Sequence, residues 1–145
     1  MYVQLIESAE GYREKAYYCS EGYPTIGIGT KLGPKGAPLD HYTLTVGRIA
    51  AKALLEQEIN EILKAICNTK WFSNCNAERR AVIVSMAYQM GTAGLLKFKK
   101  MIAAIEARNW VEAERQALDS RWAKQTERRA KHHARVLRTG IMEKL

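Results

Sequence analysis

The sequence predicts an α+β fold, in which a small β lobe near the N-terminus is separate from a larger helical lobe. Two observations carry this prediction. Short segments typical of strands are confined to residues 12–44, whereas apolar residues from position 45 onward recur at the helical period. Strands and helices that segregate along the chain are typical of α+β proteins. We therefore expect one domain over residues 1–145, with a cleft between its two lobes.

The N-terminal part begins with a predicted helix over residues 2–10, which belongs to the helical lobe. Four apolar residues recur there at helical spacing, and Gly11 stands where a left-handed C-cap would end the helix. Strands are predicted over residues 16–19 and 25–30. Glycines in the second strand suggest close approach by another backbone or a ligand. Residues 31–40 hold two glycines and two prolines, and we expect a loop there.

A long helix is predicted over residues 45–66, and at about 30 Å it is long enough to join the two lobes. Its expected apolar stripe is Ile49, Ala53, Ile59, Ile62, Leu63 and Ile66. A helix is predicted over residues 77–90 and is almost wholly apolar through residues 81–87, which is typical of a helix at the centre of a core; Gly91 ends it. The helical lobe is expected to span residues 67–145. Its further helices are predicted over 94–108, 110–118 and 127–138, with Asn109 and Thr126 as N-caps and Gly140 as a C-cap.

The formal net charge of +8 favours a polyanionic partner, such as nucleic acid, an anionic membrane or an anionic cell-wall polymer. The positive charge is concentrated between residues 121 and 138, which contain seven Lys or Arg and only one acidic residue. Residues 124–140 contain no aromatic side chain on which bases stack, so no nucleic acid is expected. No apolar run approaches the roughly 20 residues that span a bilayer, so we expect no stable membrane insertion. Because no apolar stripe remains unused, we expect a monomer.

Cys19, Cys67 and Cys75 are too few and too irregular for a disulfide framework, and they favour reduced thiols in a cytoplasmic product. There is no Cys-x-x-Cys pair and there are only three histidines, so we expect neither a metal site nor a cofactor. The N-terminus lacks the basic start and unbroken apolar segment of a secretory signal peptide. If the protein acts outside the cytoplasm, we expect another component to release it.

Glu10 is the candidate proton donor. The C-terminus of a helix carries partial negative charge, which disfavours an ionised carboxylate nearby, and burial in a cleft acts in the same direction. Glycosidases need such an acid to protonate the leaving oxygen, together with a second group on the other side of the sugar. The alternative is an ordinary surface carboxylate near a helix end. The local sequence leaves both interpretations open.

Several blocks of the sequence together resemble the T-even type of phage lysozyme, in glycoside hydrolase family 24. The blocks follow the family's order and cover most of the chain: Glu10-Gly11, Tyr17, Glu21 to Gly29, Ala77 to Arg80, Gln89 to Gly91, Ser120 to Trp122, Gln125-Thr126, Arg129-Ala130 and Arg138 to Gly140. Residues 31–46 match poorly and look shortened. The resemblance implies a lysozyme-like fold and an endolysin. Such a muramidase hydrolyses the β-1,4 bond between N-acetylmuramic acid and N-acetylglucosamine in peptidoglycan, with inversion.

The resemblance assigns Glu10 as the general acid and Thr25 as the residue that helps to hold the attacking water. Cys19 stands where the family carries an aspartate. A thiolate could activate water and stabilise positive charge on the sugar. A free thiol, with a pKa of about 8.5, needs nearby cations for this, and the basic last helix is the expected source. Two alternatives remain: a neutral thiol with a slower enzyme, and an inactive protein that binds peptidoglycan without cutting it.

Other assignments also come from the resemblance. Glu21, Gln89 and Trp122 match residues that contact the substrate, although composition alone favours a core position for Trp122. Arg129 matches an arginine that pairs with the catalytic glutamate, and such a pair favours the ionised acid. The family further implies a holin, which releases the enzyme from the host cytoplasm to the peptidoglycan of the periplasm or cell wall.

Overall fold

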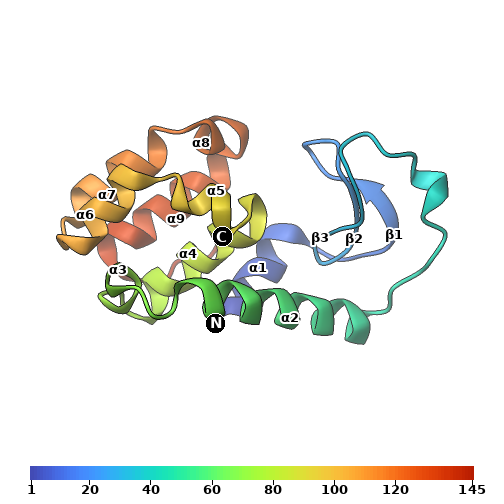
Figure 1. The fold of residues 1–145 in the computed structure, drawn as a ribbon, viewed down its shortest axis with the longest axis horizontal. Coiled ribbons are helices and arrows are strands. Elements are labelled where there is room, and N and C mark those ends of the chain that lie inside the picture. The colour runs from blue at the N-terminus through green and yellow to red at the C-terminus, as the bar shows by residue number, and fades with distance from the viewer.

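The computed structural model describes residues 1–145 and confirms the α+β prediction. A three-stranded antiparallel sheet stands apart from the packed helices, and α2 (Arg48–Ile66) runs beneath both (Figure 1). The strands are β1 (Arg13–Tyr18), β2 (Pro24–Gly27) and β3 (Thr30–Lys31). The other elements are α1 (Tyr2–Glu10), the 3-10 helix η1 (Leu39–His41), α3 (Lys70–Ser73), α4 (Ala77–Met90), α5 (Thr92–Leu96), α6 (Lys99–Glu106), α7 (Trp110–Leu118), α8 (Arg121–Gln125) and α9 (Glu127–Thr139).

Helix α1 ends at Glu10, as predicted, because the next residue leaves helical geometry. Gly11 has φ +69° and ψ −175°, and its N–H donates to the Glu7 carbonyl at 2.9 Å. The positive φ suits a glycine. The ψ value lies outside the left-handed helical region, so the predicted left-handed cap is wrong in its geometry. The extended ψ sends the chain directly away from the helix toward β1.

The strand predicted over residues 25–30 is a tight hairpin. β2 ends at Gly27, β3 begins at Thr30, and the register pairs Ile26 with Thr30. The φ angles of Gly27 and Gly29 are +65° and +72°, which a strand does not contain. These glycines make the reversal possible, and they do not merely weaken a strand. The hairpin brings β3 beside the residues at the start of β2.

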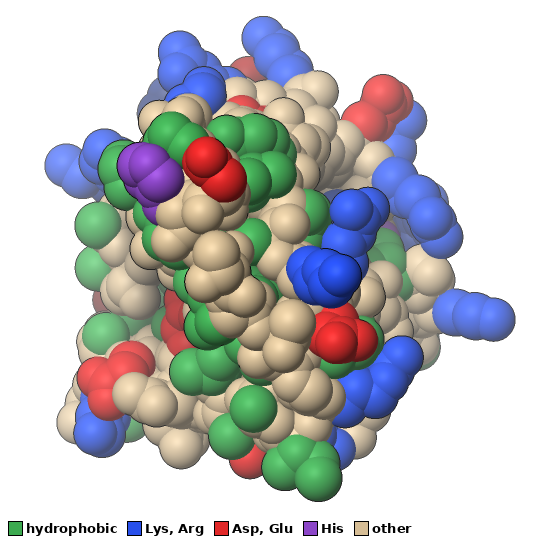
Figure 2. Space-filling view, turned by 90° about the vertical axis from the view of Figure 1, so that its right-hand side faces the viewer, with side chains coloured by type: hydrophobic (Ala, Val, Ile, Leu, Met, Phe, Trp, Pro, Cys, Tyr) green, Lys and Arg blue, Asp and Glu red, His purple; other side chains and the backbone are tan.

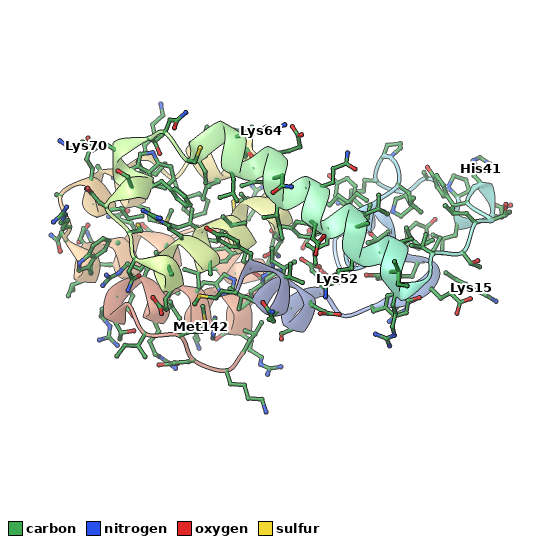
Figure 3. All side chains as sticks on the ribbon, turned by 90° about the horizontal axis from the view of Figure 1, so that it is seen from below. Lys15, His41, Lys52, Lys64, Lys70 and Met142 are labelled. Atoms are coloured by element: carbon green, nitrogen blue, oxygen red, sulfur yellow. The ribbon has the colours of Figure 1, made fainter.

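Helix α2 begins at Arg48, three residues later than predicted, because Thr45 forms an isolated bridge with Lys15 of β1. The helix lies along the lower side of the molecule, with Lys64 over the helical part and Lys52 nearer the sheet (Figure 3). The predicted apolar stripe is wrong at two positions, because Ile49 is 89% exposed and Ala53 is also exposed. The buried positions are Ala51, Leu55, Ile59, Ile62 and Ile66.

Helix α4 is central to the helical part, as predicted, and every residue from 81 to 88 is buried. One continuous cluster of 32 buried hydrophobic residues joins the helices and the sheet. The helix predicted over 94–108 is two helices, α5 and α6. The backbone of Phe98 leaves helical geometry between them, with ψ +58°. Two short helices, α3 and α8, were not predicted.

The predicted helix ends of α7 and α9 are largely confirmed. The Asn109 side chain accepts the N–H of Glu112 and caps α7. Gly140 ends α9 in left-handed geometry, with φ +71° and ψ +14°. Thr126 stands at the N-cap of α9, but its hydroxyl donates to the carbonyl of Trp122 and caps nothing.

Candidate active site

Helix α1 carries Glu10 to the junction between the sheet and the helical part. Its carboxylate Oε1 accepts a hydrogen bond of 2.7 Å from Nη1 of Arg129, which projects from α9. The two side chains are only 20% and 10% exposed, so this ion pair is largely shielded from water. The other oxygen, Oε2, faces Gly29 in the β2–β3 hairpin and accepts no hydrogen bond from the protein. One oxygen of the carboxyl is therefore held, and the other is available.

Two pockets meet at Glu10, and both are also lined by Ser20 and Gln89. The small pocket, of about 70 Å³, lies toward the sheet. Its remaining lining residues are Cys19, Glu21, Thr25, Gly29, Lys31 and Tyr88. The large pocket, of about 370 Å³, lies toward the start of α9. Its remaining lining residues are Ser8, Ala9, Thr126, Glu127, Arg128, Arg129 and Leu145.

Thr25 lies in β2 on the wall of the small pocket and is only 2% exposed. Its hydroxyl donates its single proton to the carbonyl of Tyr23 at 2.8 Å. The lone pairs of the same oxygen remain available as acceptors. Thr25 is thus set to accept a hydrogen bond from a water molecule in the small pocket.

Cys19 lies in the turn between β1 and β2. The turn is closed by the N–H of Gly22, which donates to the Cys19 carbonyl at 2.9 Å, and by the N–H of Cys19, which donates to Tyr23 at 3.0 Å. The thiol is half-buried on the wall of the small pocket and makes no hydrogen bond. Glu21, also half-buried, lines the same pocket two residues later.

Lys31 supplies a cation to the small pocket and was not predicted as a site residue. Its Nζ lies 4.5 Å from the centre of the Tyr23 ring. The register pairs Lys31 with Thr25 across β2 and β3, so recognising the hairpin would have placed it beside the site.

Gln89 lines both pockets, and Trp122 holds it in place. The indole N–H of Trp122 donates to Oε1 of Gln89 at 2.8 Å. Trp122 itself is only 6% exposed, lines neither pocket and packs edge-on against Phe98. The structure therefore places Gln89 at the pocket surface and Trp122 behind it, as a support.

A serine of the apolar helix α4 anchors the far side of Arg129. Nη2 of Arg129 donates to the Ser85 hydroxyl at 2.9 Å and to the Ser85 carbonyl at 3.1 Å. Sequence reasoning missed Ser85, and its only signal was a polar residue inside an otherwise apolar run. The guanidinium is thus held on one side by α4 and on the other by the carboxylate of Glu10.

Two tyrosines near the small pocket are favoured in their neutral form. Burial raises the pKa of Tyr88, which donates its hydroxyl proton to the carbonyl of Ile28. Burial, with an added contribution from Glu10, also raises the pKa of Tyr17. No group of three or more His, Cys, Asp or Glu side chains is arranged to hold a metal ion. The available chemistry is a shielded carboxyl, a hydroxyl acceptor and a thiol around one small pocket.

The family model described as phage lysozyme matches residues 7–138. The chain belongs to the phage lysozyme family. Glu10, Thr25 and Arg129 all lie within the matched region, as does Cys19.

Relatives of this phage lysozyme family member extend over almost its whole length. "Probable T4-type lysozyme 1" of Dictyostelium discoideum is 27% identical over 95% of this chain and 94% of its own length, and "Probable T4-type lysozyme 2" is 26% identical. The pre-baseplate central spike protein Gp5 of Enterobacteria phage T4 is 29% identical over 97% of this chain. The match spans only 28% of Gp5.

Proposed function

We propose that this protein hydrolyses the β-1,4 bond between N-acetylmuramic acid and N-acetylglucosamine in bacterial peptidoglycan, with inversion. The observation that carries the proposal is the placement of Glu10. Its Oε1 is held by Arg129, while Oε2 accepts no hydrogen bond from the protein, and Glu10 lines a pocket that Thr25 and Cys19 also line. Membership of the phage lysozyme family supports the same substrate.

In this proposal Glu10 donates its proton to the bridging oxygen of the glycan. The acid must be held at a fixed angle to that oxygen, and its pairing with Arg129 restricts rotation of the carboxyl group. Oε2 is the oxygen that carries the proton, because Oε1 already accepts from the guanidinium. As the glycosidic bond breaks, positive charge develops on the sugar.

The attacking water in this proposal stands in the small pocket. Thr25 accepts a hydrogen bond from this water, since the threonine hydroxyl donates its own proton to the carbonyl of Tyr23. Cys19 stands on the same wall. As a thiolate it takes the proton that the water loses on attack; as a thiol it only fills space, and that proton passes to solvent. Inversion follows when water and leaving oxygen lie on opposite faces of the sugar.

Substrate contact in this proposal comes from Glu21 and Gln89, which line the pockets, with Trp122 holding Gln89. The net charge of +8 attracts the protein to anionic wall polymers. Lys and Arg side chains project around much of the face seen from the sheet end (Figure 2). No helix combines the length and hydropathy that a membrane crossing requires.

The test is loss of turbidity of outer-membrane-permeabilised Gram-negative cells. Wild type should clear the cells, and Glu10→Gln should not. Glu7→Gln is the matched control, because Glu7 lies one turn earlier on α1 and lines neither pocket. Clearing by Glu10→Gln would eliminate the proposed proton donor. The anomeric form of the first product, followed by NMR, tests inversion.

Two variants of Cys19 separate the roles left open for the thiol. A thiolate role requires Cys19→Ser to lose activity, whereas a space-filling role requires it to match wild type. Cys19→Asp restores the carboxylate that the family resemblance places at this position. An inactive wild type together with an active Cys19→Asp would make this chain a peptidoglycan-binding protein without hydrolytic activity.

A further inference from the structure

The Glu10–Arg129 pair continues into the helical core through a line of hydrogen-bonding groups. Ser85, which accepts from Nη2 of Arg129, also lies with its Oγ 2.7 Å from Nε2 of His133 on α9. Nδ1 of His133 lies 2.8 Å from Nδ1 of His132. The contacts join α4 to α9 over separations of 44 and 48 residues.

The far end of this line determines which atoms carry protons. Nε2 of His132 lies 2.8 Å from the main-chain carbonyl oxygen of Glu143, which can only accept. Nε2 of a neutral His132 therefore carries the proton, and its Nδ1 accepts. His133 must then donate from Nδ1 and accept at Nε2, so the Ser85 hydroxyl donates to it. The Ser85 oxygen is left with its lone pairs for Arg129.

The surroundings favour the neutral form of His133. Ser85 and His133 are fully buried, and His132 is 6% exposed. Burial, followed by the charges of Arg129 and His132, holds the pKa of His133 well below its ordinary value.

Charged groups meet the pair of histidines from two sides, and an aromatic ring packs against it from a third. Arg129 lies on the side of α1 and Glu10, and the indole of Trp122 from α8 lies 6.1 Å from the His133 ring. The outer edge of His132 shares a surface pocket with charged residues of α9 and of the segment after it. These are Arg128, Lys131, Arg135, Glu143 and Lys144.

We propose that Ser85, His133 and His132 are positioning residues, which fix the Arg129 guanidinium and so orient the carboxyl group of Glu10. The inference rests on the proposed role of Glu10 as proton donor. Nε of Arg129 is buried without a hydrogen-bond partner, so its two Nη atoms alone anchor the guanidinium. The pair of histidines keeps the Ser85 hydroxyl from rotating toward its own helix, where serines commonly bond the preceding turn.

The proton positions can be measured without any substrate. In protein labelled with ¹⁵N at histidine, the ring nitrogen shifts distinguish protonated from unprotonated nitrogens. At neutral pH we expect Nε2–H for His132 and Nδ1–H for His133, with exposed His41 as the internal reference. A proton on Nε2 of His133 would reverse the direction of hydrogen-bond donation between His133 and Ser85 and overturn the proposal.

The kinetic test compares kcat and KM on soluble peptidoglycan strands. Ser85→Ala and His133→Leu should lower kcat about tenfold with KM changed less than about twofold, because only the acid is misplaced. His133→Gln should retain most of kcat, since its amide reaches the place of Nε2 and can bond Ser85. Val136→Ala, a fully buried change on the same helix away from the line, is the control and should keep wild-type kcat below its melting temperature.

The outcomes separate this inference from the proposed function. Wild-type kcat in Ser85→Ala and His133→Leu would overturn the positioning role, and so would equal losses in His133→Gln and His133→Leu. If Val136→Ala lowered kcat as much as Ser85→Ala and His133→Leu do, the loss would reflect stability alone. This result would also overturn the positioning role. If Glu10→Gln stays active, the proposed function itself fails, whereas an inactive Glu10→Gln beside an active Ser85→Ala removes only the positioning role.

Discussion

Gly29 lies directly against the carboxyl group of Glu10. A Cβ atom on residue 29 would stand 2.8 Å from Oε2 and 2.9 Å from Cδ, closer than real Cβ contacts come. Gly29 also has φ +72°, which L side chains rarely adopt. The hairpin and the end of α1 can approach this closely only because residue 29 lacks a side chain. Glu10 and Gly29 therefore line the small pocket side by side.

Gly29→Ala should therefore damage both stability and activity. We expect a loss of about 1–3 kcal/mol in the free energy of unfolding, from backbone strain and the clash, and a fall in kcat of at least about tenfold, because the carboxyl must move. Gly36→Ala is the matched control, since Gly36 has φ +80° with open space around it. Urea denaturation and turbidity assays measure the two effects. Equal activity in the two variants would show that the contact with Glu10 is unimportant.

Arg129→Met should destabilise the protein by about 3 kcal/mol, because it leaves the largely buried Glu10 without its partner. The change should also lower kcat, since the carboxyl is free to rotate. Arg115→Met removes an exposed bidentate contact with Glu112, and it should leave the denaturation midpoint and the clearing rate unchanged. A similar midpoint for both variants would mean that burial adds nothing to the Glu10–Arg129 pair.

Glycines and capping residues made the helix ends predictable, whereas the buried face of a helix depends on the elements that pack against it. Gly11, Gly91 and Gly140 each follow the last residue of a helix, as the sequence indicates. The apolar stripe of α2 was not predictable in full, because apolar residues such as Ile49 and Leu54 stand on more than one side. Only the elements that cover the helix determine which of these residues are buried.

The candidate site, too, was predictable only in part. Glu10, Thr25 and Arg129 were found because they belong to a motif that a single sequence displays. Ser85 and His133 were missed, since each acquires its role from a partner on another helix. A polar residue inside a buried helix needs hydrogen bonds, and this is the one signal that the sequence offered for Ser85.

Stability should fall in mildly acidic solution because His133 is buried as a neutral base. Its pKa in the folded protein lies well below the ordinary value of 6.5. As the pH falls through about 6.5, the unfolded chain binds a proton that the folded protein does not. The stabilisation is therefore full above this pH and declines below it by about 1.4 kcal/mol per pH unit, until the folded form itself titrates.

Urea denaturation between pH 7.5 and 5 measures this contribution as a difference between variants. His133→Gln should show a shallower loss of unfolding free energy than wild type, because glutamine does not titrate. His41→Gln changes an exposed histidine and should follow wild type. Parallel curves for all three proteins would place the acid sensitivity elsewhere.

The three thiols should react with a disulfide reagent at very different rates in the folded protein. Burial raises the pKa of Cys75 to about 11, and its thiol donates to the carbonyl of Trp71, so little thiolate forms near pH 7.5. Cys67 is exposed at the end of α2 and should react first, while the half-buried Cys19 follows. In Cys67→Ser the fastest phase should disappear, and in Cys75→Ala the folded protein should react as wild type does. Release of the Cys75 thiol should require denaturant, and its modification without denaturant would mean that the core around α3 opens readily.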